Sequence, residues 1–172
     1  MIQTELFFSS KSDDWATPLE FFRQLDYEFN FSLDPCCTTL NCKCSYGYYK
    51  DEGIDGLSQD WYNDLHDKPN YNVYMNPPYG KSILYWIEKA YIEWQKGCTV
   101  VALLPARTDT DWFHRFIYGK AEVRFIKGRL KFGGSKNSAP FPSMIVIFKQ
   151  PSTRTRLPQR AETGETSRKN DG

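Results

Sequence analysis

The spacing of apolar positions changes along the chain between the period of a helix and that of a buried strand. Residues 15–29, WATPLEFFRQLDYEF, carry apolar side chains three residues apart, as one face of a helix does. Thr17 precedes this stretch as a capping residue does, and Pro18 suits the first helical position. We therefore predict a helix that begins near Pro18 and is capped by Thr17.

Continuous apolar runs elsewhere predict strands. The run CTVVALLP is β-branched and aliphatic throughout, which is typical of an inner strand covered on both faces. Strands are expected within residues 29–35, 71–75, 98–105, 121–126, 129–132 and 143–148, and further helices within residues 83–97 and 109–119. Residues 36–70 are polar and aromatic without clear periodicity, and we expect mainly loops there. The alternating order predicts an open, mostly parallel α/β sheet flanked by helices, with ligands at the carboxyl ends of its strands.

Size and composition favour one folded domain over residues 1–150. The 172 residues are 40% hydrophobic and 16% aromatic, enough for a full core. Residues 151–172 lack apolar periodicity, and a disordered basic tail is expected there. No run approaches the roughly 20 apolar residues of a membrane span, and the N-terminus lacks a basic-then-apolar leader, so we expect a cytoplasmic protein.

Four of the five cysteines, Cys36, Cys37, Cys42 and Cys44, stand close together in the sequence. They contain no Cys-x-x-Cys pair, and both histidines are distant, which argues against a zinc site. Buried free thiols are the better interpretation, and no metal is expected.

Charge is distributed unevenly along the chain. Residues 1–75 carry 13 acidic and 5 basic side chains, whereas residues 76–150 carry 12 basic and 5 acidic ones. Seven of the basic side chains lie within residues 115–136, beside the single acidic Glu122. Such a polarity suggests one face that meets a polyanion; the alternative is a solvated charge pattern without a partner.

Residues 76–80, NPPYG, lie at the end of an expected strand. The following Lys81-Ser82 gives them a likeness to a phosphate-binding loop, but Met75 stands where that loop requires glycine. Pro77 and Pro78 also lack the backbone N–H groups that would hold a phosphate. A nucleoside-triphosphate site is therefore excluded.

Two prolines instead hold their carbonyl groups in fixed directions. Asn76 adds a side-chain carbonyl and Tyr79 a flat ring, so the corner suits a planar group that carries an amine, such as the amino edge of a base. The alternative is a simple turn in which Asn76 caps the next helix. The residues alone favour neither.

Several motifs together resemble one enzyme family. Asn76-Pro77-Pro78-Tyr79 resembles the [DNS]-P-P-[YFW] motif of amino-group methyltransferases that use S-adenosylmethionine. The segments WATP at 15–18, FSLDPC at 31–36, LSQDW at 57–61 and residues 128–148 extend the resemblance to the Dam-type DNA adenine methyltransferases of bacteriophages and prophages. The resemblance covers about residues 9–148.

The resemblance implies a Rossmann-like methyltransferase fold that binds S-adenosylmethionine and double-stranded DNA in a bacterial host cell. Its catalytic residues would be Asn76, Pro77, Pro78 and Tyr79, and its cofactor residues Trp15, Thr17, Pro18, Asp34, Pro35 and Asp60. For DNA contact we expect Arg129, Lys131, Phe132, Lys136, Asn137 and Ser138. One departure is plain: Cys36-Cys37-Thr38-Thr39 stands where the family's cofactor loop is glycine-rich.

Other functions remain open at the level of sequence. Similar motifs serve methylation of the N4 amine of cytosine and of amino groups in RNA or protein, although Asn76 favours adenine or an amide over cytosine. A cytosine carbon-5 enzyme is disfavoured because its acidic partner motif is missing. A DNA-binding module without catalytic activity is a further alternative.

Overall fold

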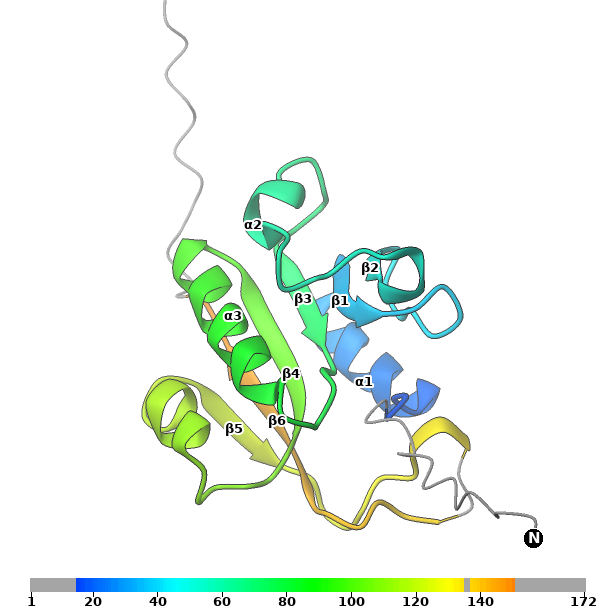
Figure 1. Cartoon of the computed structure of the whole chain (residues 1–172), viewed down its shortest axis with the longest axis vertical. Coiled ribbons are helices and arrows are strands. Elements are labelled where there is room, and N and C mark those ends of the chain that lie inside the picture. Colours follow the sequence, from blue (N-terminus) through cyan, green and yellow to red (C-terminus); the bar gives the residue numbers. More distant parts are fainter. Residues whose placement is uncertain (1–14, 135–136, 151–172) are drawn as a thin grey trace, which may run out of the picture.

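The computed structural model describes residues 15–134 and 137–150. They form one six-stranded sheet in the order β2-β1-β3-β4-β6-β5 (Figure 1). Its strands are β1 (Leu33–Cys37), β2 (Tyr46–Tyr49), β3 (Asn72–Met75), β4 (Thr99–Pro105), β5 (Glu122–Phe125) and β6 (Ser143–Phe148). Strands β1 to β5 run in one direction, and β6 runs antiparallel between β4 and β5. The expected open, mostly parallel α/β sheet is confirmed.

Two longer helices cover the sheet, α1 (Leu19–Phe29) and α3 (Ile83–Lys96). In α1, Phe22 packs edge-on against Tyr74 of β3, whereas in α3 Tyr91 packs against Phe148 of β6. Tyr74 is in register with Val101, and Phe148 with the adjacent Val100, and neighbouring residues of a strand point to opposite faces. The two helices therefore cover opposite faces of the sheet.

The remaining helical elements are short. They are α2 (Trp61–Asp64), the 3₁₀ turns η1 (Lys50–Glu52) and η3 (Phe132–Gly134), and the π-helix η2 (Phe113–Ile117). The helix expected within residues 109–119 is thus mainly a π-helical turn. Within the described residues no helix has the length and apolar character needed to cross a membrane.

Three sequence expectations are wrong in detail. Helix α1 has Pro18 at its N-cap, without a side-chain cap from Thr17. Residues 129–132 form no strand, because Gly128 and Gly133 on either side adopt positive φ angles that break an extended backbone. Strand β2, in contrast, lies inside the segment expected to be loops; it is a four-residue edge strand, too short for a clear alternation. The expected tail, residues 151–172, lies outside the described residues.

The order of the strands determines where a ligand can bind. From β1 the chain adds β2 on one side, and then β3 on the other side of β1. The order in which strands are added therefore reverses between β1 and β3, although the strands stay parallel. Ligands of open α/β sheets bind at this reversal, beyond the carboxyl ends of the strands. Asp34 in β1 and Asn76 after β3 both lie there.

Helix α3 also contains a buried charge. The Glu93 side chain is fully buried and accepts hydrogen bonds from the Tyr62 N–H at 3.0 Å and from Lys89 and Lys96 at 2.7 and 2.9 Å. We predict that Glu93→Ala lowers the free energy of unfolding in urea by about 3 kcal/mol, because these donors lose their acceptor. Glu88→Ala on the same helix should change it by less than about 0.5 kcal/mol. Equal losses in both variants would contradict this assignment.

Candidate functional site

The carboxamide of Asn76 is held by one end. Its Nδ2 donates to the carbonyl oxygen of Trp15 at 2.5 Å and to Oγ1 of Thr17 at 2.9 Å. A carbonyl oxygen only accepts, so Nδ2 must face Trp15 and Oδ1 must point the other way. Within the described part of the chain Oδ1 is buried and has no hydrogen-bond partner. A buried unpaired acceptor costs about 1–3 kcal/mol, which indicates that a donor from a ligand belongs there.

Thr17 connects this amide to the sheet. Its hydroxyl lies 2.6 Å from the phenol oxygen of Tyr74, and both side chains are buried. Thr17 therefore does not cap α1 as expected but fixes the orientation of Asn76. The alternative for Asn76 is also wrong, because the N-cap of α3 is Ser82, and no side chain caps that helix.

Tyr79 lies in an aromatic cluster with Trp15, Phe132 and Phe141. Its ring meets Phe141 and Phe132 edge-on, with centroids 5.4 and 6.3 Å apart, and its hydroxyl donates to the Leu103 carbonyl at 3.2 Å. The centroid of the Trp15 ring lies 5.5 Å from that of Phe132 and 5.2 Å from that of Phe141. Only 4% of Tyr79 is exposed, so these rings cover it.

Asp34 is a buried carboxylate on the other side of the reversal point. It accepts hydrogen bonds from the backbone N–H groups of Cys36 and Lys43, both at 3.2 Å. Burial nevertheless raises the pKa of Asp34 to about 6, since these bonds and the charge of Lys43 only partly compensate for lost hydration. The ionised form therefore lacks a full counter-charge.

Two adjoining cavities meet at this point. A small polar cavity of about 30 Å³ is lined by Trp15, Thr17, Asp34, Lys43, Tyr74 and Asn76, among others. A larger, mostly apolar cavity of about 340 Å³ is lined by Pro35, Ile54, Leu57, Pro78 and Trp86, among others. Cys36 and Asn41 line both, so together they form a two-part site of the size that small-molecule ligands occupy.

Glycines outside the segment after Asp34 allow the close packing around it. A Cβ on Gly56 would lie 2.2 Å from the Pro35 carbonyl oxygen, and a Cβ on Gly47 would lie 2.5 Å from two cysteine sulfurs. Single glycines in β2 and in the loop beyond it thus permit close packing against residues 34–42. The sequence motifs did not identify these two glycines as site residues, nor Lys43, Tyr74 and Trp86.

Of the expected DNA-binding residues, Phe132 belongs to the aromatic cluster. Arg129, Lys131, Asn137 and Ser138 are exposed, and Lys136 lies outside the described residues. The Gly133 N–H donates to the Ala16 carbonyl at 2.8 Å, which ties this loop to the segment that holds Asn76. Arg124, from the same basic region, instead pairs with Glu28 and Glu122.

Asp60 is not brought to either cavity. Its side chain caps α2 by accepting from the Asn63 N–H at 3.3 Å, and it pairs with Lys96 at 3.0 Å. The other expected cofactor residues Trp15, Thr17 and Asp34 line the polar cavity, and Pro35 lines the apolar one; Pro18 adjoins Thr17.

An open, mostly parallel sheet with a two-part cavity at its reversal point defines an α/β protein of the ligand-binding class. The chain belongs to the DNA N-6-adenine-methyltransferase (Dam) family, whose model matches residues 5–169, as the motifs predicted.

Two phage proteins give the comparison more detail. The chain is 27% identical over 147 residues to the DNA N-6-adenine-methyltransferase of Haemophilus phage HP1 (strain HP1c1), covering 81% of this chain and 80% of the relative. It is also 27% identical over 119 residues to the DNA N-6-adenine-methyltransferase of Escherichia phage T1, covering 69% of this chain and 46% of that protein. The chain thus matches about half the length of the T1 relative.

The raised pKa of Asp34 makes stability depend on pH. Between about pH 4 and pH 6 the folded state retains a proton that the unfolded chain, with its lower pKa, has lost. The free energy of unfolding should therefore fall as pH rises through this interval, by up to about 3 kcal/mol, and should stay lower above it. Asp34→Asn should remove this dependence. Urea unfolding of both proteins at pH 4 and pH 8 measures the free energies of unfolding. The same pH dependence in the wild type and in Asp34→Asn would contradict the prediction.

Proposed function

We propose that this protein methylates the N6 amine of adenine in double-stranded DNA, with S-adenosylmethionine as the methyl donor. The observation that carries the proposal is the unpaired, buried Oδ1 of Asn76 at the polar cavity. Family membership and the names of the two phage relatives support the same activity. We expect it to act in the cytoplasm of a bacterial host cell.

The two-part cavity fits such a donor. When bound, S-adenosylmethionine supplies a methyl group on a positively charged sulfur. Asp34, whose ionised form lacks a full counter-charge, would hold the ammonium of its amino-acid end, and Thr17 and Trp15 border the same cavity. Pro35, Pro78 and Trp86 line the apolar part, where the nucleoside end would lie. Asp60 and Pro18 have no such placement to support them.

Asn76 would act on the base. The lone pair of adenine's amine is delocalised into the ring, so the amine is a poor nucleophile. Oδ1 of Asn76 would accept a hydrogen bond from one N6 hydrogen and the Pro77 carbonyl from the other, which draws electron density onto the nitrogen. The positive charge that develops there is stabilised by acceptors that are already oriented, because Trp15 and Thr17 fix the amide. No side chain needs to remove a proton before attack; the sulfur would leave as a neutral thioether, and the methylated nitrogen would then lose one proton to solvent.

Tyr79 would stack on the adenine, a contact worth about 1–3 kcal/mol. A paired base does not reach this site, so the adenine must be flipped out of the duplex. Because Phe132 and Phe141 cover the Tyr79 ring, they must separate from it when the base enters. Arg129, Lys131 and Lys136 would hold the flanking phosphates, with Asn137 and Ser138 near the bases.

Replacement of Asn76 tests its role in the reaction. Transfer of a tritiated methyl group to unmethylated DNA should fall at least tenfold in Asn76→Ala, or about 1.4 kcal/mol of transition-state stabilisation, because the oriented acceptor is lost. Asn63→Ala, an exposed amide on α2, is the matched control and should keep wild-type activity. DNA affinity should be similar in all three proteins.

Digestion of the labelled DNA to nucleosides identifies the product. N6-methyladenine is the expected one. Label in N4-methylcytosine alone, an absence of label with the wild type, or full activity in Asn76→Ala would contradict the proposal.

The salt dependence of DNA binding tests the proposed phosphate contacts. The double variant Arg129→Ala/Lys131→Ala should bind DNA more weakly and lower the slope of log K against log salt by about 2, since two contacts are lost. Lys149→Ala is the control. Lys149 follows the antiparallel strand β6, so it lies at the opposite end of the strands from Asn76. Equal slopes for the double variant and the wild type would exclude these contacts.

A further inference from the structure

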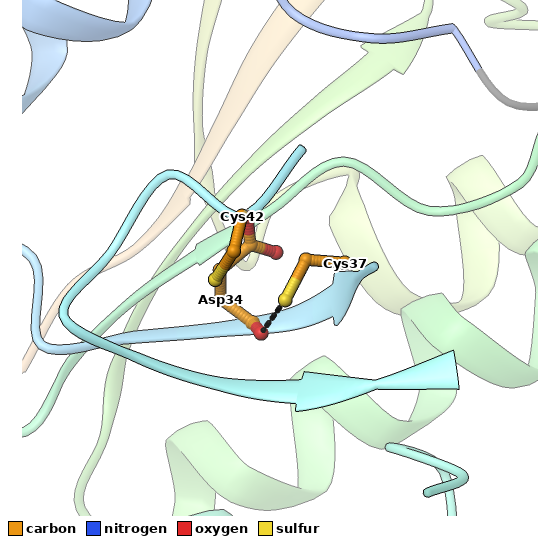
Figure 2. A group of neighbouring side chains, drawn as sticks. All are labelled: Asp34, Cys37 and Cys42. Carbon is orange, nitrogen blue, oxygen red and sulfur yellow. Dashed lines mark hydrogen bonds between the residues drawn. The ribbon is translucent and has the colours of Figure 1, made fainter. Parts of the chain in front are cut away.

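Three potential metal ligands meet at the end of β1. A carboxylate oxygen of Asp34 and the sulfurs of Cys37 and Cys42 all lie within 4.8 Å of one another (Figure 2). Asp34 and Cys37 are buried and Cys42 is half-buried. No metal is expected here from the sequence, because these residues are spaced Asp-x-x-Cys-x-x-x-x-Cys and not as a Cys-x-x-Cys pair.

A bulge in β1 brings Asp34 and Cys37 together. Residues three apart on a regular strand point to opposite faces. Here Asp34 is opposite Gly47 and Cys37 opposite Tyr49, so three steps along β1 match only two along β2. The extra residue turns Cys37 to the face of Asp34. Pro35, which has no N–H to give to the ladder, lies inside this bulge.

A tight turn returns Cys42 to the same place. The N–H groups of Asn41 and Cys42 both donate to the Thr38 carbonyl, at 3.3 and 3.1 Å, and fold the chain back over β1. The space for both sulfurs exists because residue 47 is glycine: its Cβ would lie 2.5 Å from each. Any larger residue at 47 would displace the two thiols.

We propose that Asp34, Cys37 and Cys42 bind one thiophilic divalent cation, Zn²⁺ being the natural candidate, with solvent at a fourth tetrahedral position. Zinc–sulfur bonds of about 2.3 Å place two thiolates about 3.8 Å apart, so the present separations need to contract by only about 1 Å. Two thiolates and a carboxylate favour zinc over magnesium or calcium, which prefer oxygen ligands alone.

The second coordination layer is also present. The Lys43 N–H donates to Oδ2 of Asp34 and the Cys36 N–H to Oδ1, which holds the carboxylate in place while leaving lone pairs free. Asp34 belongs to both proposed sites, and they are compatible in charge: two thiolates and a carboxylate with a divalent cation keep one net negative charge, which still favours an ammonium group nearby. Metal binding should release the thiol protons, so affinity should rise with pH.

The test uses the full chain, kept reduced and stripped of metal. Titration with Co²⁺ should give one bound ion per chain, with sulfur-to-cobalt charge-transfer absorption and the ligand-field bands of a tetrahedral site, and Zn²⁺ should displace it. Cys42→Ser should weaken binding at least tenfold. The control Cys98→Ala, which removes a buried thiol just before β4, should leave binding unchanged. Circular dichroism confirms that each variant is folded.

A second measurement needs no variant. Zn²⁺ should protect Cys37 and Cys42 from alkylation, as located by mass spectrometry of peptides, while Cys36 and Cys44 react at an unchanged rate. The proposal is overturned if the reduced, folded wild type shows no thiolate absorption with Co²⁺, if protection is absent, or if Cys42→Ser retains wild-type affinity.

Discussion

The orientation of the Asn76 carboxamide is the constraint on which the site depends. Two acceptors, the Trp15 carbonyl and the Thr17 hydroxyl, take both Nδ2 protons, and Tyr74 holds Thr17 from β3. Rotation of the amide would place Oδ1 against the Trp15 carbonyl, where two acceptors repel each other. Within the described residues Oδ1 has no partner and points away from Trp15, so this acceptor is already oriented before a donor arrives.

Asn76, just after β3, and Asp34, in the neighbouring β1, both lower the stability of the folded state through a buried polar group. The first is a buried acceptor without a donor among the described residues, and the second is a buried carboxylate whose pKa is raised to about 6. Each makes the folded state less stable by an amount on the order of 1–3 kcal/mol. A ligand with an ammonium group and one with an amine would relieve both. Folded proteins retain such costs mainly at functional sites, which makes the pair stronger evidence than either residue alone.

How much the sequence predicts depends on the range of the interactions. The runs at residues 98–105 and 143–148 predicted inner strands because burial on both faces leaves a continuous apolar run, and those strands are present. Thr17 was assigned as a helix cap from its neighbours, but partners 57 and 59 residues away decide its role. The cluster of Asp34 with two cysteines was missed because a bulge, invisible in local periodicity, turns Cys37 to the same face.

The aromatic cluster sets a limit on what base stacking contributes. If a base stacks on Tyr79 as proposed, the ring would give up its edge-on contacts with Phe132 and Phe141, and such pairs are worth about 0.5–1.5 kcal/mol each. The lost contacts, about 1–3 kcal/mol together, equal the stacking energy that the base supplies. Stacking is then an exchange with little net gain. In the proposed mechanism, net affinity would then come from phosphate contacts at the exposed loop, and discrimination between bases from the oriented acceptor of Asn76.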